Sequence, residues 1–236
     1  PWTMPQGNPL RGIVHGDATF VAVGNAGAVV TSDDGGATWV RRPPPRDANL
    51  GDVAFAAGVF IAVGDRGTLV RSVDRGRVWE SRPTGVTGSL HGVAAGDGTA
   101  VVVGAGGALL RSEDAGRTWS RRTTPRDVDW LAVAWGNGTF VAVGAGGAVA
   151  RSTDAGRSWT AISLDTSEEM RCVAFGNGVF VAGGPIYSAW KSADGAAWMR
   201  VETSVTMMSW VRFLDGRFAA DGQSIPALIS WSADGT

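Results

Sequence analysis

The stretch Ser32-Asp33-Asp34-Gly35-Gly36-Ala37-Thr38-Trp39 recurs along this chain and predicts its fold. Its serine returns at a constant interval, and each copy keeps the pattern Ser-x-Asp-x-Gly-x-Thr-Trp in full or shortened form, beginning at Ser32, Ser72, Ser112, Ser152, Ser192 and Ser232. A period of about forty positions with several β-rich segments per repeat is typical of a β-propeller. We therefore predict an all-β, six-bladed propeller whose blades are four-stranded antiparallel sheets.

The last copy of the motif ends at Thr236 without its tryptophan, whereas the chain begins with Pro1-Trp2. Joining the two ends restores the pattern, so we predict that residues 1–5 pair with the strand around residues 228–230 and complete the sixth blade. Such pairing would cover an otherwise open sheet edge. We expect one domain over residues 1–236, with blades that begin near residues 10, 50, 90, 130, 170 and 210.

The acidic and aromatic residues of the motif are predicted to be structural. An Asp carboxylate can accept backbone N–H groups within a turn, and a Trp can bury a large apolar surface against its sheet. No metal is predicted, because the carboxylates belong to separate hairpins. The residues with this predicted role are Asp34, Asp74, Asp114, Asp154, Asp194, Asp234, Trp2, Trp39, Trp79, Trp119, Trp159 and Trp198.

Composition excludes several classes of protein. A net charge of −1 without a long basic run argues against a dedicated nucleic-acid binder. The sequence has no apolar run long enough for a transmembrane helix. The single cysteine, Cys172, cannot form an intramolecular disulfide and is expected to be a buried apolar residue. We expect a monomer without a cofactor.

The repeats resemble the Asp-box, or bacterial neuraminidase repeat, group. The pairing of this motif with Phe-Val-Ala-Val-Gly, at residues 20–24 and 140–144, looks most like bacterial relatives of photosystem II stability/assembly factors. The resemblance implies a propeller that acts as a protein-binding scaffold and is secreted or periplasmic. The chain begins with Pro rather than Met, so we expect that it is either processed or trimmed from a longer protein, in which case an export signal has been lost.

The resemblance also has limits. The photosynthetic factors are generally seven-bladed, whereas this chain has six repeats. Sialidases share the Asp-box but need an arginine triad and a tyrosine nucleophile, and the one tyrosine here, Tyr187, lies in a hairpin of the fifth blade. No catalytic residue is carried over to this chain, because the motif implies a fold and not an activity.

Departures from the repeat gather in its last three copies. The residue before the first strand is Leu in the first three blades and becomes Trp130, Met170 and Trp210 in the others. The turn between the second and third strands gains Tyr187 and Gln223, whereas the first four blades have plain Gly-containing turns. We predict that these five residues form a partner-binding patch on one face. The alternative is that the larger side chains plug the mouth of the channel.

Three functions follow from these observations. The first is a non-enzymatic binding or assembly scaffold whose partner is another protein. The second is a carbohydrate-binding propeller, with Trp130, Trp210 and Tyr187 stacking on sugar rings. The third is a sialidase-like glycoside hydrolase, which needs two carboxylates about 5–10 Å apart. No evident pair occurs among the candidates Asp52, Asp129, Glu168, Glu169 and Asp221.

Overall fold

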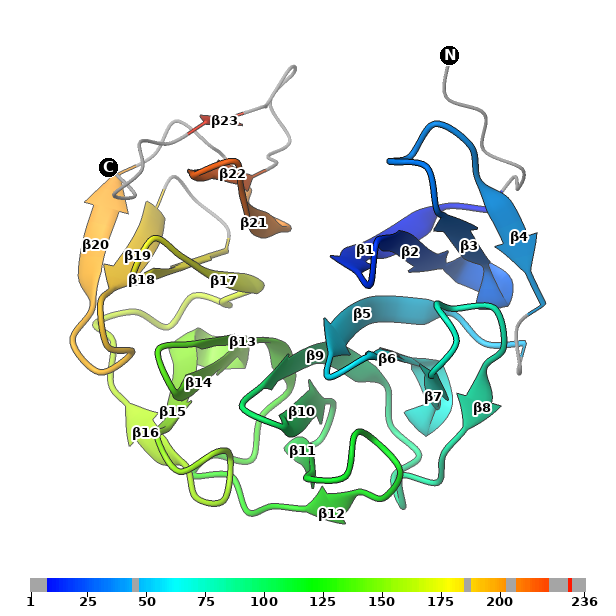
Figure 1. The fold of residues 1–236 in the computed structure, drawn as a ribbon. Coiled ribbons are helices and arrows are strands. Elements are labelled where there is room, and N and C mark those ends of the chain that lie inside the picture. The colour runs from blue at the N-terminus through cyan, green and yellow to red at the C-terminus, as the bar shows by residue number, and fades with distance from the viewer. Residues whose placement is uncertain (1–7, 44–46, 185–187, 203–206, 221–228, 231–236) are drawn as a thin grey trace. The chain divides into compact units, whose positions relative to one another are not determined.

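The computed structural model describes residues 8–43, 47–184, 188–202, 207–220 and 229–230. In these ranges the chain is built from antiparallel sheets, five with four strands and one with three, as Figure 1 shows. The prediction of an all-β protein made of four-stranded antiparallel sheets is confirmed. The chain divides into two compact units, Pro1–Arg121 and Arg122–Thr236, which are described in turn.

The first unit holds three sheets of consecutive strands. The first sheet contains β1 (Leu10–Gly16), β2 (Thr19–Gly24), β3 (Val29–Ser32) and β4 (Val40–Arg42). The second contains β5 (Leu50–Ala56), β6 (Val59–Gly64), β7 (Leu69–Ser72) and β8 (Glu80–Ser81). The third contains β9 (Leu90–Gly96), β10 (Thr99–Gly104), β11 (Ala108–Ser112) and β12 (Ser120–Arg121).

The second unit repeats this plan. Its first sheet contains β13 (Trp130–Gly136), β14 (Thr139–Gly144), β15 (Ala148–Ser152) and β16 (Thr160–Ile162). The next contains β17 (Cys172–Gly176), β18 (Val179–Gly183), β19 (Ser188–Ser192) and β20 (Met199–Glu202). The last described sheet contains β21 (Val211–Leu214), β22 (Arg217–Ala220) and β23 (Ile229–Ser230).

Each hairpin between the first and second strands is tight. Asn137 and Gly138 have φ of 48° and 69°, so both central residues of this turn are left-handed. That geometry matches the twist of the flanking strands, and Asn-Gly is well suited to adopt it. The following strand, β14, is buried along its whole length, which explains its run of Val, Phe and Ala.

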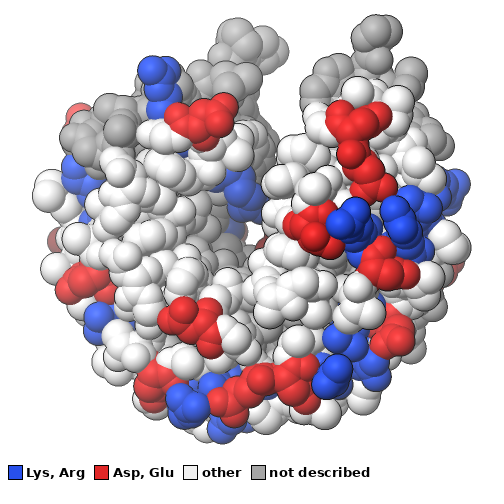
Figure 2. Space-filling view, in the orientation of Figure 1, with Lys and Arg blue, Asp and Glu red and all other residues white. Residues whose placement is uncertain are grey.

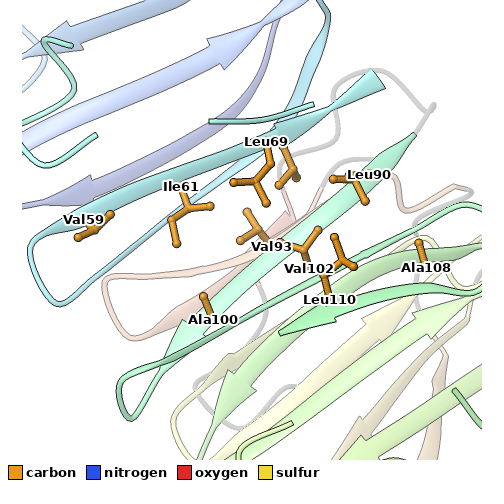
Figure 3. Close-up of a cluster of buried hydrophobic side chains, with 10 residues drawn as sticks. Val59, Ile61, Leu69, Leu90, Val93, Ala100, Val102, Ala108 and Leu110 are labelled. Carbon is orange, nitrogen blue, oxygen red and sulfur yellow. The ribbon is translucent and has the colours of Figure 1, made fainter. Parts of the chain in front are cut away.

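Apolar side chains from neighbouring sheets interdigitate to form the core. Figure 3 shows one such cluster in the first unit, where Ile61 and Leu69 of the second sheet meet Val93 and Val102 of the third. Burial of a side chain of this size contributes about 1.5–3 kcal/mol, so the contacts between sheets are a large part of the stability.

An aromatic ring on the first strand of one sheet packs on a glycine of the preceding sheet. Phe55 covers Gly16 in the first unit, and Phe175 covers Gly136 in the second. A Cβ added to Gly136 would lie 2.0 Å from the ring of Phe175. Glycine is therefore required at these positions for close approach and not for an unusual φ.

Basic residues at the ends of third strands also join sheets. Arg71, at the end of β7, is buried and donates from Nε to the carbonyl oxygen of Ala115 in the next sheet, at 3.1 Å. Arg151 makes the equivalent bond to the carbonyl oxygen of Asp194, at 2.6 Å. The buried guanidinium of Arg71 needs such an acceptor. Both bonds tie a third strand to the turn motif of the following sheet.

Candidate functional site

Hydrogen bonds tie together each turn that carries the repeated Ser-x-Asp motif, and these turns keep the name Asp-box here for their sequence pattern. Asp114 accepts from Ser112 Oγ at 2.8 Å, from the Thr118 backbone N–H at 2.9 Å and from Thr118 Oγ1 at 2.6 Å. Trp119 Nε1 donates to the carbonyl oxygen of Gly116 at 3.2 Å, which holds the indole against the turn. The carboxylate thus satisfies backbone donors that a short turn leaves open.

The bond from the serine of the motif recurs in the other described copies, at Asp34, Asp74, Asp154 and Asp194. The hydroxyl bond recurs at Asp34 and Asp154, from Thr38 and Ser158. Trp39 and Trp79 are buried. Trp119, Trp159 and Trp198 are half-buried. Asp234 and Trp2 lie outside the described residues. Within the described ranges, no group of three His, Cys, Asp or Glu residues is placed to hold a metal ion.

Hydrogen bonds hold these carboxyl groups in their ionised form. The Thr38 hydroxyl and backbone N–H lower the pKa of Asp34 to about 2. Burial opposes ionisation of Asp114 and Asp154, yet bonds from Thr118 and Ser158 outweigh it and lower each pKa to about 2. These shifts have a structural cause, since the donors belong to the turn that the carboxylate closes.

The structure corrects the prediction that Trp130 and Met170 offer surface to a partner. Trp130 is 0 % exposed, and Met170 is 2 % exposed. Met170 packs with Val143 and Val149 of the preceding sheet, as Leu50 packs with Val23 and Val29 in the first unit. A larger side chain at this position therefore fills the core.

Trp210 does not occupy the position that the period of the repeat assigns to it. Met208, which precedes it in the chain, donates from its backbone N–H to the Gly184 carbonyl oxygen at 3.0 Å, as Met170 donates to Gly144 at 3.0 Å. Met208 is therefore the equivalent of Met170, and it is buried as well. Trp210 is 39 % exposed and could still contact a partner. The two other predicted residues, Tyr187 and Gln223, lie outside the described residues.

A polar hollow lies on the turn face of the first unit, defined here as the end that carries the loops before β5 and β9 and the turns after β2 and β6. Its volume is about 530 Å³, and its described lining residues are Ala26, Asp47, Ala48, Asn49, Asp65, Arg66 and Ser89. A pocket of about 330 Å³ shares Asp47, Ala48 and Arg66. We call this hollow the turn-face hollow.

Hydrogen bonds run across the turn-face hollow from sheet to sheet. Asn49 accepts from the Ala26 backbone N–H at 2.9 Å and donates to Asp65 Oδ2 at 2.8 Å. Ser89 Oγ donates to the other oxygen of Asp65 at 3.3 Å. Three sheets thus contribute to one ordered polar surface, which favours a rigid site over a mobile loop.

Arg66 is the residue of this surface that departs most from the repeat. Its φ is 56°, in the left-handed region, where the equivalent residues of the third and fourth sheets are Gly106 and Gly146. The first sheet has Ala26 there, with a φ of 50°, so Arg66 is the one long side chain at this position in the first four sheets. A long side chain in a strained backbone conformation points to a role other than stability. Its NH2 group donates to the carbonyl oxygen of Asp47 at 2.8 Å, which orients the guanidinium over the hollow.

Sequence reasoning treated this turn as an ordinary one and missed the site. The signal that could have found it is a long, charged side chain at a position where the first copy has Ala26 and the third and fourth have Gly. On the face in view, Figure 2 shows acidic and basic side chains side by side over the part of the picture where Figure 1 has β1–β8. Neither charge dominates, in agreement with the net charge of −1.

Two of the acidic candidates for hydrolysis have structural partners. Asp52 Oδ2 accepts from the backbone N–H of Val93 at 3.0 Å, which joins β5 to β9. Glu169 Oε1 accepts from Arg171 Nε at 2.6 Å. These bonds account for both residues without a catalytic role.

The repeated antiparallel sheets and their turn motifs define a β-propeller with repeats of the bacterial neuraminidase type. The model of the photosynthesis system II assembly factor YCF48 family matches residues 44–204, and the chain belongs to this family. The resemblance to photosystem II assembly factors is thereby confirmed. Among curated proteins, none matches the chain closely enough to count as a relative.

Solved structures share the fold at low sequence identity. YCF48 bound to a D1 peptide is 20 % identical, with a TM-score of 0.76 over 98 % of this chain and 81 % of that one. YCF48 from Cyanidioschyzon merolae is 15 % identical, with a TM-score of 0.54 over 100 % and 98 %. A virginiamycin B lyase from Staphylococcus aureus is 11 % identical, with a TM-score of 0.82 over 98 % and 86 %. At such identities the likeness concerns the fold alone.

The described residues include no helix that is long and apolar enough to cross a membrane. The sequence predicts the same, because it contains no long apolar run.

Proposed function

We propose that this chain is a non-enzymatic scaffold that binds a segment of another protein. The observation that carries the proposal is membership of the YCF48 family, together with the structure of a protein of similar fold, YCF48, bound to a D1 peptide. The turn-face hollow supports it, since it is an ordered polar surface with an outward-facing Arg66. Backbone and side-chain groups of an extended segment suit such a surface.

In the first unit, the contact is assigned to the turn-face hollow, whose charged lining residues are Arg66, Asp47 and Asp65. In the second unit, Trp210 remains a proposed contact, with Tyr187 and Gln223 proposed from the sequence. Glycan binding is less well supported, because the buried Trp130 is not available for stacking on a sugar ring. We further assign the chain to a bacterial, secreted or periplasmic monomer.

The proposed architecture is a six-bladed ring that residues 1–5 close. One exposed apolar residue of β1, Ile13, supports closure. Ile13 is 50 % exposed, whereas its equivalents Val53 and Val211 are 5 % and 0 % exposed under the packing of adjacent sheets. A similar sheet packed on β1 would bury Ile13 in the same way.

The test is selection of a displayed library of short random peptides on the immobilised protein, followed by calorimetric titration of the enriched peptides. We expect binding in the micromolar range, on the order of −8 kcal/mol. Arg66→Gly inserts the residue of the third and fourth repeats and relieves the strained φ, so it should preserve the fold. It should weaken binding at least about tenfold. Arg117→Ala, at the other end of the third sheet, is the matched control and should not weaken it.

A library that yields no peptide above background, while a glycan array gives specific binding, would contradict the proposal. Equal affinity of wild type and Arg66→Gly would contradict the placement at the turn-face hollow but not peptide binding itself.

A further inference from the structure

The Asp-box of the second sheet differs from its neighbours at two exposed positions. Val73 and Val78 are 61 % and 63 % exposed. The first, third and fourth copies have polar residues there, namely Asp33 and Thr38, Glu113 and Thr118, and Thr153 and Ser158. The shorter fifth copy has Ala193 and Ala197 there. The second copy therefore presents two larger aliphatic side chains where three of the other copies are polar and one has only alanines.

This departure removes a hydrogen bond from the turn. In the third sheet, Thr118 Oγ1 donates to Asp114 Oδ2 at 2.6 Å, and Val78 has no hydroxyl to repeat that bond. Asp74 keeps the donors to its Oδ1, including the backbone N–H of Val78 at 2.9 Å. The two valines therefore make the turn less stable and expose apolar surface to water. A departure from the motif that brings no structural gain indicates a functional role.

Two arginines stand between the valines in the same turn. Arg75 Nε lies 2.9 Å from Asp17 Oδ2, and Arg77 NH2 lies 3.5 Å from Asp33 Oδ2. In both ion pairs the acidic and the basic side chain are exposed, so water screens the charges and the pairs contribute little to stability. Within the described residues Arg75 uses only its Nε, which leaves its terminal amino groups for a carboxylate that arrives from outside.

We propose that this turn is a docking point for a peptide segment of a partner protein in which an aliphatic or aromatic residue lies next to Asp or Glu. The apolar side chain covers Val73 and Val78, and the acid binds Arg75. An apolar centre with a charged border that includes Arg is the usual anatomy of a small binding hot spot. The turn follows the end of β7, opposite the turn-face hollow, so it is a second contact.

The experiment is peptide display on wild type with counter-selection on the double variant Val73→Thr/Val78→Thr. Enriched peptides should carry an apolar residue beside an acid and should lose at least about tenfold in affinity for the double variant. The threonine hydroxyl that replaces Val78 can donate to Asp74, so the variant should melt at an equal or higher temperature. Lost binding with retained melting temperature separates docking from folding.

Thr38→Val is the matched control, because it removes the equivalent bond to Asp34 in the first sheet. It should lower the melting temperature and leave peptide affinity unchanged. Arg75→Ala, which inserts the residue of the third and fourth copies, should weaken binding by about threefold to tenfold.

A selection that finds no peptide able to distinguish wild type from the double variant overturns this inference. Peptides that bind both proteins alike, and lose affinity for Arg66→Gly, leave the proposed function standing and place binding at the turn-face hollow alone. Self-association in sedimentation that disappears in the double variant would also overturn it, since the occupant would then be a second copy of the chain.

Discussion

Gly136→Ala tests how neighbouring sheets lock together. The new Cβ would lie 2.0 Å from Phe175 Cγ. Since carbon atoms pack at about 3.5 Å or more, the ring or the strand must move by about 1.5 Å. Forced overpacking of this kind costs about 1–3 kcal/mol. For a chain of this size each kcal/mol lowers Tm by about 2–4 °C, so a drop of about 2–12 °C is expected.

The assay is urea unfolding combined with calorimetry, with Gly51→Ala as the control. The nearest atom to a Cβ on Gly51 is a carbonyl oxygen at 3.8 Å, which is ordinary contact, so the control should cost less than about 0.5 kcal/mol. In a double-mutant cycle, Phe175→Ala should remove the clash and recover about 1 kcal/mol. If Gly136→Ala and Gly51→Ala cost the same, the proposed packing of ring on glycine is wrong.

Three further outcomes are expected. The pKa of Asp114 in the folded protein, about 2, lies below its value in the unfolded chain, so its contribution to stability is present above about pH 4 and is lost as pH falls toward 2. Asp114→Asn should therefore reduce the pH dependence of the unfolding free energy between about pH 4 and pH 2. An unchanged dependence on pH would count against the turn bonds. Met208→Ala should lower stability by about 2–5 kcal/mol without changing peptide affinity, whereas Trp210→Ala should weaken peptide binding and leave stability unchanged. Calorimetric unfolding and peptide titration measure the two effects, and a loss of affinity in Met208→Ala would contradict the assignment. Deletion of residues 1–5 should lower stability by about 3–5 kcal/mol, and an unchanged melting curve would argue against ring closure by this segment.

The period of the Asp-box was sufficient to predict the sheets. Because one hairpin turn recurs at a constant interval, the β-rich segments between copies had to fold into the same four strands. Chemistry local to the turn, such as the bonds from Ser112 and Thr118 to Asp114, follows from residue type and needs no distant contact.

Burial at the start of each first strand could not be predicted in the same way. The period gives the position of Met170 within the repeat. The space available to its side chain depends on packing against the preceding sheet, about which the period gives no information. A size change from Leu to Met or Trp can be absorbed by packing, so departure from the repeat was a poor signal for surface.

In the sixth repeat the start of the first strand is displaced along the sequence relative to the other repeats. The interval from Met170 to its equivalent Met208 is shorter than the interval from Ser192 to Ser232. The shortening before β21 is thus balanced by an equal lengthening before the next Asp-box. Equal spacing of the motif made Trp210 look like the equivalent of Met170, and only the hydrogen bond from Met208 to Gly184 reveals the true register.

The most direct test of the central claim, that this chain is a peptide-binding scaffold, is hydrogen–deuterium exchange with a selected peptide at saturation. Binding at the turn-face hollow should slow exchange in residues 24–27, 47–49 and 64–68, because the segment would cover these turns and exclude water from their amides. Protection should disappear in Arg66→Gly at the same peptide concentration. Unchanged exchange throughout the chain, in the presence of any enriched peptide, would contradict the account.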